Sequence, residues 1–261
     1  MEKDLRSSIP IGGGAPPAGF PYKAQELPYG ARRIAPALPE NVQYGASVEK
    51  SESARLLVLD LTGVLVPKES LLAARLCTEH RPHLVSAGME MLRKYGGGAM
   101  TATQLIVGCG YMLKGLTEEQ VRAGARKIEP AAGAREFVSA ARERGFIPAI
   151  ITSDLQEAAE KVAGDLGIPQ ELAVGNVGVY NSGVHTGAFR TPYVADAGKT
   201  ATAIRLKENV GVAAVVAVGD DWTNQDLFGA SDFSVAFNAP PGLEAHARVY
   251  GGFDELLAAL D

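Results

Sequence analysis

The chain has 261 residues, of which 46% are hydrophobic, and a formal net charge of −5. This length supports one sizeable core, or a core with a small second lobe, and the scattered basic residues give no electrostatic support for a nucleic-acid or anionic-membrane partner. No apolar stretch reaches the ~18 residues of a membrane span, and the N-terminus lacks the apolar region of a secretion signal. The two cysteines, Cys77 and Cys109, are far apart and outside any CxxC motif, which indicates free thiols in a reducing compartment. We therefore expect a cytoplasmic protein with no membrane segment.

The first 54 residues differ in composition from the rest of the chain. They contain GGG at 12–14 and seven prolines, and no helical or strand period continues through them. We interpret 1–54 as an irregular or flexible N-terminal extension. Its aromatic residues offer anchors to the domain or to a second copy of the chain, so a homo-oligomer is kept as a hypothesis.

From Arg55 onward, short apolar runs alternate with amphipathic segments. Strands that alternate with helices indicate a parallel sheet, and such sheets bind ligands at the carboxyl ends of their strands. The fold class predicted is therefore α/β. We predict strands over 56–61, 147–151, 213–219 and 233–237, and helices over 133–145, 155–167 and 198–211.

The region 68–128 interrupts this alternation with four helical stretches in succession, separated by glycines. A helical insertion directly after the turn of the first strand is typical of a cap above a site. A bundle with a purely structural purpose is the alternative. Thr117 and Gln120 are spaced as a capping box for the last of these helices. We divide the chain into an α/β core over 55–66 and 129–261 and a helical cap over 67–128.

Polar side chains stand where two of the predicted strands end. Asp60 ends the first strand and is followed by a turn that contains glycine. Thr152 and Ser153 end the second predicted strand, and their hydroxyls, with the N–H groups of the next helix, would form an anion pocket. An isolated aspartate at a strand end is often only a turn residue, so the prediction depends on Asp60 occurring together with the other polar residues at the strand ends.

The third core strand ends in VGDDWTNQD (218–226), which places Asp220, Asp221 and Asp226 on one loop. Clustered carboxylates repel one another unless a cation binds, and a ligand set made only of oxygen suits Mg²⁺. Lys199 begins the preceding helix and could neutralise a phosphate or the Asp60 carboxylate.

From about residue 55 to its end, the chain resembles the haloacid dehalogenase-like hydrolases, and within them the phosphoserine-phosphatase type with a helical cap. A carboxylate, a hydroxyl, a lysine and a carboxylate pair follow one another in the order of that family's four motifs. The stretches that carry the resemblance are DLTGV (60–64), Thr152, Lys199, GDDWTN (219–224), and the segments 112–121, 166–187 and 235–241.

The resemblance implies a Rossmann-like parallel-sheet core with the cap inserted after the first strand, and Mg²⁺-dependent hydrolysis of a small phosphorylated metabolite. Asp60 would attack phosphorus and form an aspartyl phosphate, which water then hydrolyses. The candidate site residues are Asp60, Thr62 and Lys199 for catalysis; Thr152, Ser153 and Glu69 for phosphate and substrate; and Asp60, Thr62 (by its backbone carbonyl), Asp220, Asp221 and Asn224 for the metal.

Thr62 departs from the family motif DxDGT, whose second aspartate protonates the leaving oxygen and later activates water. General acid–base help is worth ~10²–10⁴-fold, and threonine does not titrate near neutral pH. Three accounts stay open: a leaving group that needs no proton, such as an acyl phosphate or pyrophosphate; substitution by Glu69 of the cap; or phosphate binding without rapid turnover. The alternatives to a phosphohydrolase are accordingly a phosphotransferase or slow aspartyl-phosphate enzyme, and a catalytically quiet regulatory or binding subunit.

The substrate-recognition residues of the resemblance also differ. Glu69 matches the cap glutamate that engages the amino group of phosphoserine. The arginine that would bind its carboxylate falls at Cys109, and a cysteine cannot make a bidentate carboxylate contact. We therefore do not expect phosphoserine to be the substrate. Arg75, Arg93 and Lys114 are further candidate cap contacts, with surface charge as the alternative.

Overall fold

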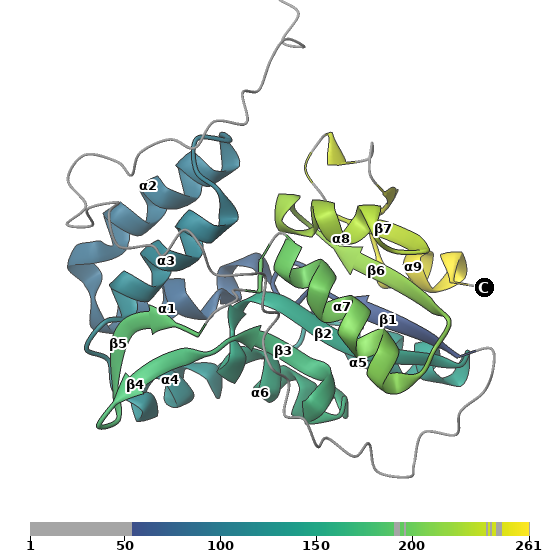
Figure 1. Cartoon of the computed structure of the whole chain (residues 1–261), viewed down its shortest axis with the longest axis horizontal. Coiled ribbons are helices and arrows are strands. Elements are labelled where there is room, and N and C mark those ends of the chain that lie inside the picture. Colours follow the sequence, from purple (N-terminus) through teal and green to yellow (C-terminus); the bar gives the residue numbers. More distant parts are fainter. Residues whose placement is uncertain are drawn as a thin grey trace, which may run out of the picture.

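The computed structural model describes residues 54–190, 194–195, 197–238, 240, 242–243 and 247–260. The prediction for 1–54 lies outside these residues, apart from Ala54. In the described part, six strands form one sheet in the order β3-β2-β1-β6-β7-β8, and every neighbouring pair is parallel (Figure 1). The strands are β1 (Arg55–Leu59), β2 (Phe146–Leu155), β3 (Ala173–Asn176), β6 (Ala214–Gly219), β7 (Phe233–Phe237) and β8 (Arg248–Tyr250).

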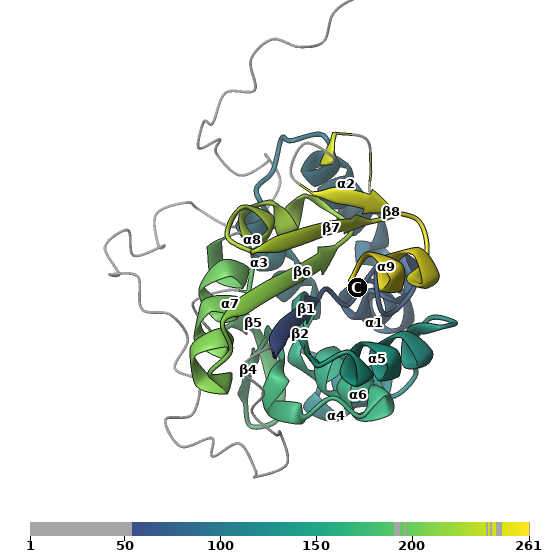
Figure 2. The same cartoon turned by 90° about the vertical axis from the view of Figure 1, so that its right-hand side faces the viewer.

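Helices cover both faces of this sheet (Figure 2). Strands buried on both sides cannot alternate apolar and polar residues, which explains why β1 is a continuous apolar run, fully buried from Leu56 to Leu59. The α/β fold class predicted from the sequence is therefore confirmed. One face carries α5 (Ala134–Glu143), α6 (Gln156–Leu166) and α9 (Phe253–Ala259), and the other carries α7 (Ala197–Val210) and α8 (Gln225–Gly229).

Four helices follow β1 in the chain and lie on the left of the sheet in Figure 1, where α1 contacts the other three. Two of them begin with complete capping boxes, Thr101 with Gln104 and the predicted Thr117 with Gln120. In each box the threonine hydroxyl accepts the glutamine N–H while the glutamine side chain accepts the threonine N–H, which satisfies two free donors of the first turn. These helices are α1 (Leu72–His80), α2 (Val85–Gly96), α3 (Ala102–Leu113) and α4 (Glu118–Ala125).

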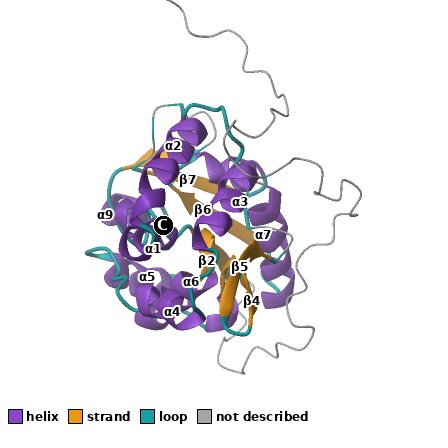
Figure 3. Cartoon of the chain, turned by 90° about the vertical axis from the view of Figure 1, so that its left-hand side faces the viewer, coloured by secondary structure: helices purple, strands orange, loops and turns teal. Residues whose placement is uncertain are grey.

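An antiparallel hairpin, β4 (Gly178–Asn181) and β5 (Val184–Phe189), lies outside the main sheet and packs against α3 (Figure 3). Gly110 permits this packing, because a Cβ at this position of α3 would lie 2.6 Å from the backbone oxygen of Gly187. The hairpin therefore ties the helical insertion to the core.

In the main sheet the structure adds two strands to the four predicted, β3 and β8, and the hairpin strands β4 and β5 are a further addition outside it. Strands β3 and β8 are short, with four and three residues, and they lie at the two edges of the sheet. Strand β2 also continues through the predicted site residues to Leu155. Across the described residues, no helix has the length and apolar character required to cross a bilayer.

The contact between α3 and β5 can be tested with one methyl group. Gly110→Ala should lower the free energy of unfolding by about 1–3 kcal/mol, because the new methyl meets backbone that cannot move aside easily. Gly164→Ala in α6 is the matched control: its Cβ would come no nearer than 3.6 Å to the Gln170 side chain, so it should raise stability by about 0.5–1 kcal/mol. Urea unfolding followed by circular dichroism measures both. Equal stabilities for the two variants would contradict this packing.

Candidate active site

Three neighbouring strands, β2, β1 and β6, deliver the candidate site residues to one edge of the sheet. Leu59, the last residue of β1, pairs with Ile150 on one side and Val218 on the other. Asp60 therefore leaves the sheet between its two neighbours, and its N–H donates to the carbonyl of Val218 at 2.9 Å. The strand β2 lies on one side of β1 and β6 lies on the other, so the strand order reverses direction at β1. Ligands of open α/β sheets bind at such a point.

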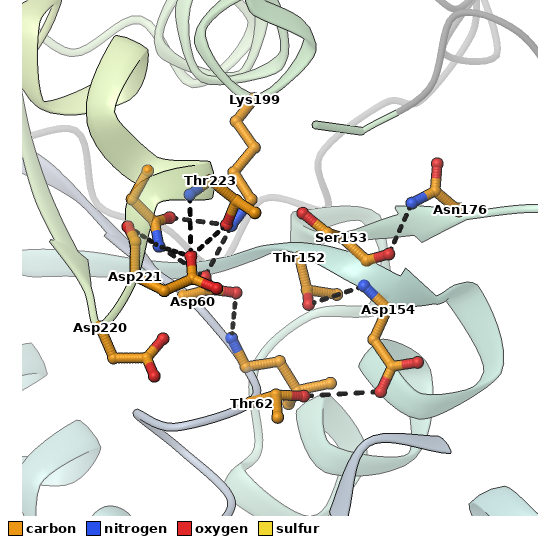
Figure 4. A network of polar contacts seen from close by, with 12 residues as sticks. Asp60, Thr62, Thr152, Ser153, Asp154, Asn176, Lys199, Asp220, Asp221 and Thr223 are labelled. Carbon is orange, nitrogen blue, oxygen red and sulfur yellow. Dashed lines mark hydrogen bonds and ion pairs between the residues drawn. The ribbon is translucent and has the colours of Figure 1, made fainter. Parts of the chain in front are cut away.

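Both oxygens of the Asp60 carboxylate are held by donors (Figure 4). The N–H of Leu61 donates to Oδ1 at 2.7 Å, while Lys199 Nζ and Asn224 Nδ2 donate to Oδ2 at 2.6 and 2.8 Å. Lys199 is fully buried, and its ammonium also donates to Asn224 Oδ1 at 2.8 Å and to Thr223 Oγ1 at 3.1 Å. A buried ammonium is tolerated here because three oxygen acceptors surround it.

Three carboxylates meet beside this network. Oxygens of Asp60, Asp220 and Asp221 lie within 4.8 Å of one another. Asp220 Oδ1 is buried without a hydrogen-bond partner, and Oδ2 pairs with Lys68 Nζ at 2.9 Å. Burial, and then the charges of Asp60 and Asp221, raise the pKa of the Asp220 carboxyl to about 7.

The donor set fits a hard divalent cation. A buried carboxylate oxygen without a partner, next to two further carboxylates, is the arrangement that Mg²⁺ relieves. Gly63 makes room for the Asp220 carboxylate: its φ of +89° lies in the left-handed region, and a Cβ there would lie 1.9 Å from Asp220 Oδ2. Asn224 is fully buried, and its amide contacts Asp60 and Lys199; its place among the metal residues stays a prediction.

The end of β2 carries hydroxyls and a further carboxyl. Thr152 Oγ1 accepts the N–H of Asp154 at 3.1 Å, and Ser153 Oγ is buried without a hydrogen-bond partner. The Asp154 carboxylate accepts the N–H of Leu72, the first residue of α1, at 2.9 Å and the Thr62 hydroxyl at 3.5 Å. Burial raises the pKa of the Asp154 carboxyl to about 6.

Asp154 was missed in the sequence, although it directly follows Thr152 and Ser153 in the run IITSD. A carboxylate next to two hydroxyls at a strand end was the available signal. The side chain is 3% exposed, so its role depends on what packs around it, and that was not readable from the motif.

A cavity of about 310 Å³ opens in front of these groups. Glu69 is exposed and does not line it, and neither do the basic residues Arg75, Arg93 and Lys114. Cys109 does line it. The wall consists of Asp60, Thr62, Lys68, Leu71, Ala73, Leu92, Tyr95, Leu105, Ile106, Cys109, Thr152, Ser153, Asp154, Leu155, Phe189, Asp220, Asp221 and Thr223.

Comparison with known proteins agrees with this geometry. A family model described as haloacid dehalogenase-like hydrolase matches residues 54–231. A search of curated proteins gave no match.

Solved structures resemble the chain over most of its length. A phospho-aspartyl intermediate analogue of phosphoserine phosphatase is 21% identical, with a TM-score of 0.70 over 80% of this chain and 99% of that one. A substrate-bound phosphoserine phosphatase complex is 21% identical, with a TM-score of 0.71 over 81% and 100%. A HAD family hydrolase, t0658 from Salmonella enterica subsp. enterica serovar Typhi, is 18% identical, with a TM-score of 0.70 over 79% and 71%. These identities show a shared fold.

The matched family model begins just before β1 and ends beyond the carboxylate loop that follows β6, so it includes every strand that carries the site. The chain belongs to the haloacid dehalogenase-like hydrolases.

Proposed function

We propose that this hydrolase is a Mg²⁺-dependent phosphohydrolase that acts on a small phosphorylated metabolite through an aspartyl phosphate on Asp60. One observation carries the proposal. The Asp60 carboxylate is fixed by Lys199 and Asn224, lies beside the unpartnered oxygen of Asp220, and faces a cavity. The solved phosphoserine phosphatases with this fold, one of them a phospho-aspartyl intermediate analogue, support the same chemistry.

Each polar residue has a separate task in the proposed reaction. An Asp60 oxygen attacks phosphorus while the bond from phosphorus to the leaving oxygen breaks. Lys199 holds the carboxylate in place and offsets its charge, and the Thr152 hydroxyl donates to a phosphoryl oxygen. Mg²⁺, held by Asp60, Asp220, Asp221 and the backbone carbonyl of Thr62, would supply positive charge to the transferring group. The rate gain comes from positioning and electrostatic stabilisation.

The proton for the leaving oxygen requires another residue, because Thr62 has no titratable group near neutral pH. Glu69 lies outside the cavity, so the structure gives no support to the hypothesis that it substitutes. Among the described residues that line the cavity, Asp154 is the carboxyl outside the acidic cluster, and it contacts the Thr62 hydroxyl. We infer that Asp154, next to Thr62, takes over the proton transfer.

A slow aspartyl-phosphate enzyme or a phosphotransferase is the second candidate. The observation in its favour is Thr62 itself, which leaves the loop after Asp60 without a base to activate water. The two candidates differ in the acceptor, because a phosphotransferase would pass the phosphoryl group to an added alcohol faster than to water.

The nucleophile is tested by Asp60→Asn. With Mg²⁺ and a panel of phosphate esters and anhydrides, we expect the wild type to release phosphate and this variant to lose at least about 10³-fold in kcat/KM, because an amide is not a nucleophile. Asp226→Asn, at an exposed aspartate of α8, is the matched control and should keep wild-type activity. Retained activity in Asp60→Asn would remove the proposed nucleophile.

The role of Asp154 is tested by comparing a substrate that has a poor leaving group with one that has a good leaving group. In Asp154→Asn, hydrolysis of an alkyl phosphate should slow by about 10²–10⁴-fold, because a poor leaving group needs a proton. Hydrolysis of p-nitrophenyl phosphate should change little, because p-nitrophenolate leaves without one. A purely structural defect would slow both substrates equally, and that outcome would exclude Asp154 as the proton donor.

A further inference from the structure

Charge is confined to one end of the cavity. The side chains of Asp60, Asp154, Asp220 and Asp221 gather at the carboxyl ends of the strands, where Lys68 pairs with Asp220 at 2.9 Å. This end is suited to a phosphoryl group and its cation. The remainder of the wall is what the organic part of a substrate would contact.

That remaining wall is mainly apolar and comes mostly from the helical insertion. It is formed by Leu71, Ala73, Leu92, Leu105, Ile106 and Cys109, with Phe189 of β5 and the partly buried Tyr95.

Among the described residues that line the cavity, Lys68 is the sole lysine or arginine. Three basic residues of the helical insertion have other partners: Arg93 and Lys94 contact Glu90 at 2.7 and 3.6 Å, and Arg75 donates to the carbonyl of Lys127. A carboxylate on the substrate would therefore be buried without a cation, which is unfavourable.

A second, smaller cavity of about 70 Å³ lies behind this wall, between α1, α2 and α3. The two cavities share Leu71, Ala73, Leu92, Leu105 and Cys109. Much of its remaining lining is apolar and includes Met89, Met91 and Met112, and methionine side chains adapt easily to ligands of different shape. The apolar surface thus continues beyond the cavity that holds the catalytic groups.

We propose that the substrate is a phosphate monoester of an uncharged, apolar alcohol, with an alkyl or aryl group that packs against Leu71, Leu92 and Leu105. This inference rests on the proposed function, because it assigns the phosphoryl end to Asp60 and its neighbours. An apolar group gains free energy from burial in such a wall, whereas an amino acid or sugar would leave buried polar groups unpaired.

Binding of phosphonates tests this inference without any turnover. Calorimetry with Mg²⁺ should show Kd falling about fourfold for each methylene added from methylphosphonate to hexylphosphonate. Phosphoserine, titrated into Asp60→Asn so that it is not hydrolysed, should bind no tighter there than methylphosphonate does. No binding, an affinity that does not change along the alkyl series, or phosphoserine binding tighter to Asp60→Asn than methylphosphonate does would overturn the inference.

Two arginine variants on α3 sharpen the test. Leu105→Arg places a cation in the wall and should abolish the gain per methylene while tightening binding of a phosphonate that carries a carboxylate. Thr103→Arg adds the same charge at an exposed position of the same helix and should leave the series unchanged. A chain-length series intact in a wild type that releases phosphate from no substrate would overturn the proposed function and leave the binding inference standing. Phosphate release together with an affinity that does not change along the alkyl series would support the proposed function and overturn the binding inference.

Discussion

The repulsion among three carboxylates at the ends of two neighbouring strands governs the arrangement of this site. Asp60 follows β1, and Asp220 and Asp221 follow β6, so the parallel pairing of the two strands brings like charges together. The buried ammonium of Lys199 balances one of them. Asp220 keeps an unpartnered oxygen and a raised pKa, which means that the protein alone does not cancel the charge. A divalent cation would complete the balance.

Neighbouring groups also pack closely around the Asp60 carboxylate. Asn224 donates to Asp60 and accepts from Lys199, so one amide joins the two charged groups. Gly219 allows this approach, because a Cβ there would lie 2.3 Å from the Asn224 side chain. The loop after β6 therefore supplies both a carboxylate pair and the amide that holds the Asp60 carboxylate. The second task was not evident in the sequence.

Much of the fold and part of the site were predictable from the sequence. Continuous apolar runs identified β1, β6 and β7 because buried parallel strands cannot alternate, and polar residues at strand ends must meet at one edge of such a sheet. The short strand β8 carries too few residues for a period. The direction of individual side chains was also not predictable from the sequence. Glu69 stands at the start of the helical insertion yet is exposed, and only tertiary packing decides whether such a side chain lies in the cavity or in solvent. The division into core and cap, and the site roles, remain proposals.

The helical insertion contributes the apolar wall of the cavity, and the sheet contributes its charged end. Asp154 connects the two, since its carboxylate accepts both the Thr62 hydroxyl and the N–H that begins α1. A change in the position of α1 would therefore be transmitted through Asp154 to the loop that follows Asp60. In this arrangement the residue proposed to donate the proton also contacts the first residue of α1.

Calorimetric titration of Mg²⁺ into the wild type at two pH values tests whether Asp60, Asp220 and Asp221 hold a divalent cation. Because the pKa of Asp220 is raised to about 7, protons compete with the cation below that pH, and affinity should be about tenfold weaker at pH 6 than at pH 8. Asp220→Asn should lose most of the binding at both values, and Asp226→Asn should behave as the wild type. Absence of Mg²⁺ binding at pH 8, or equal binding by wild type and Asp220→Asn, would contradict the account.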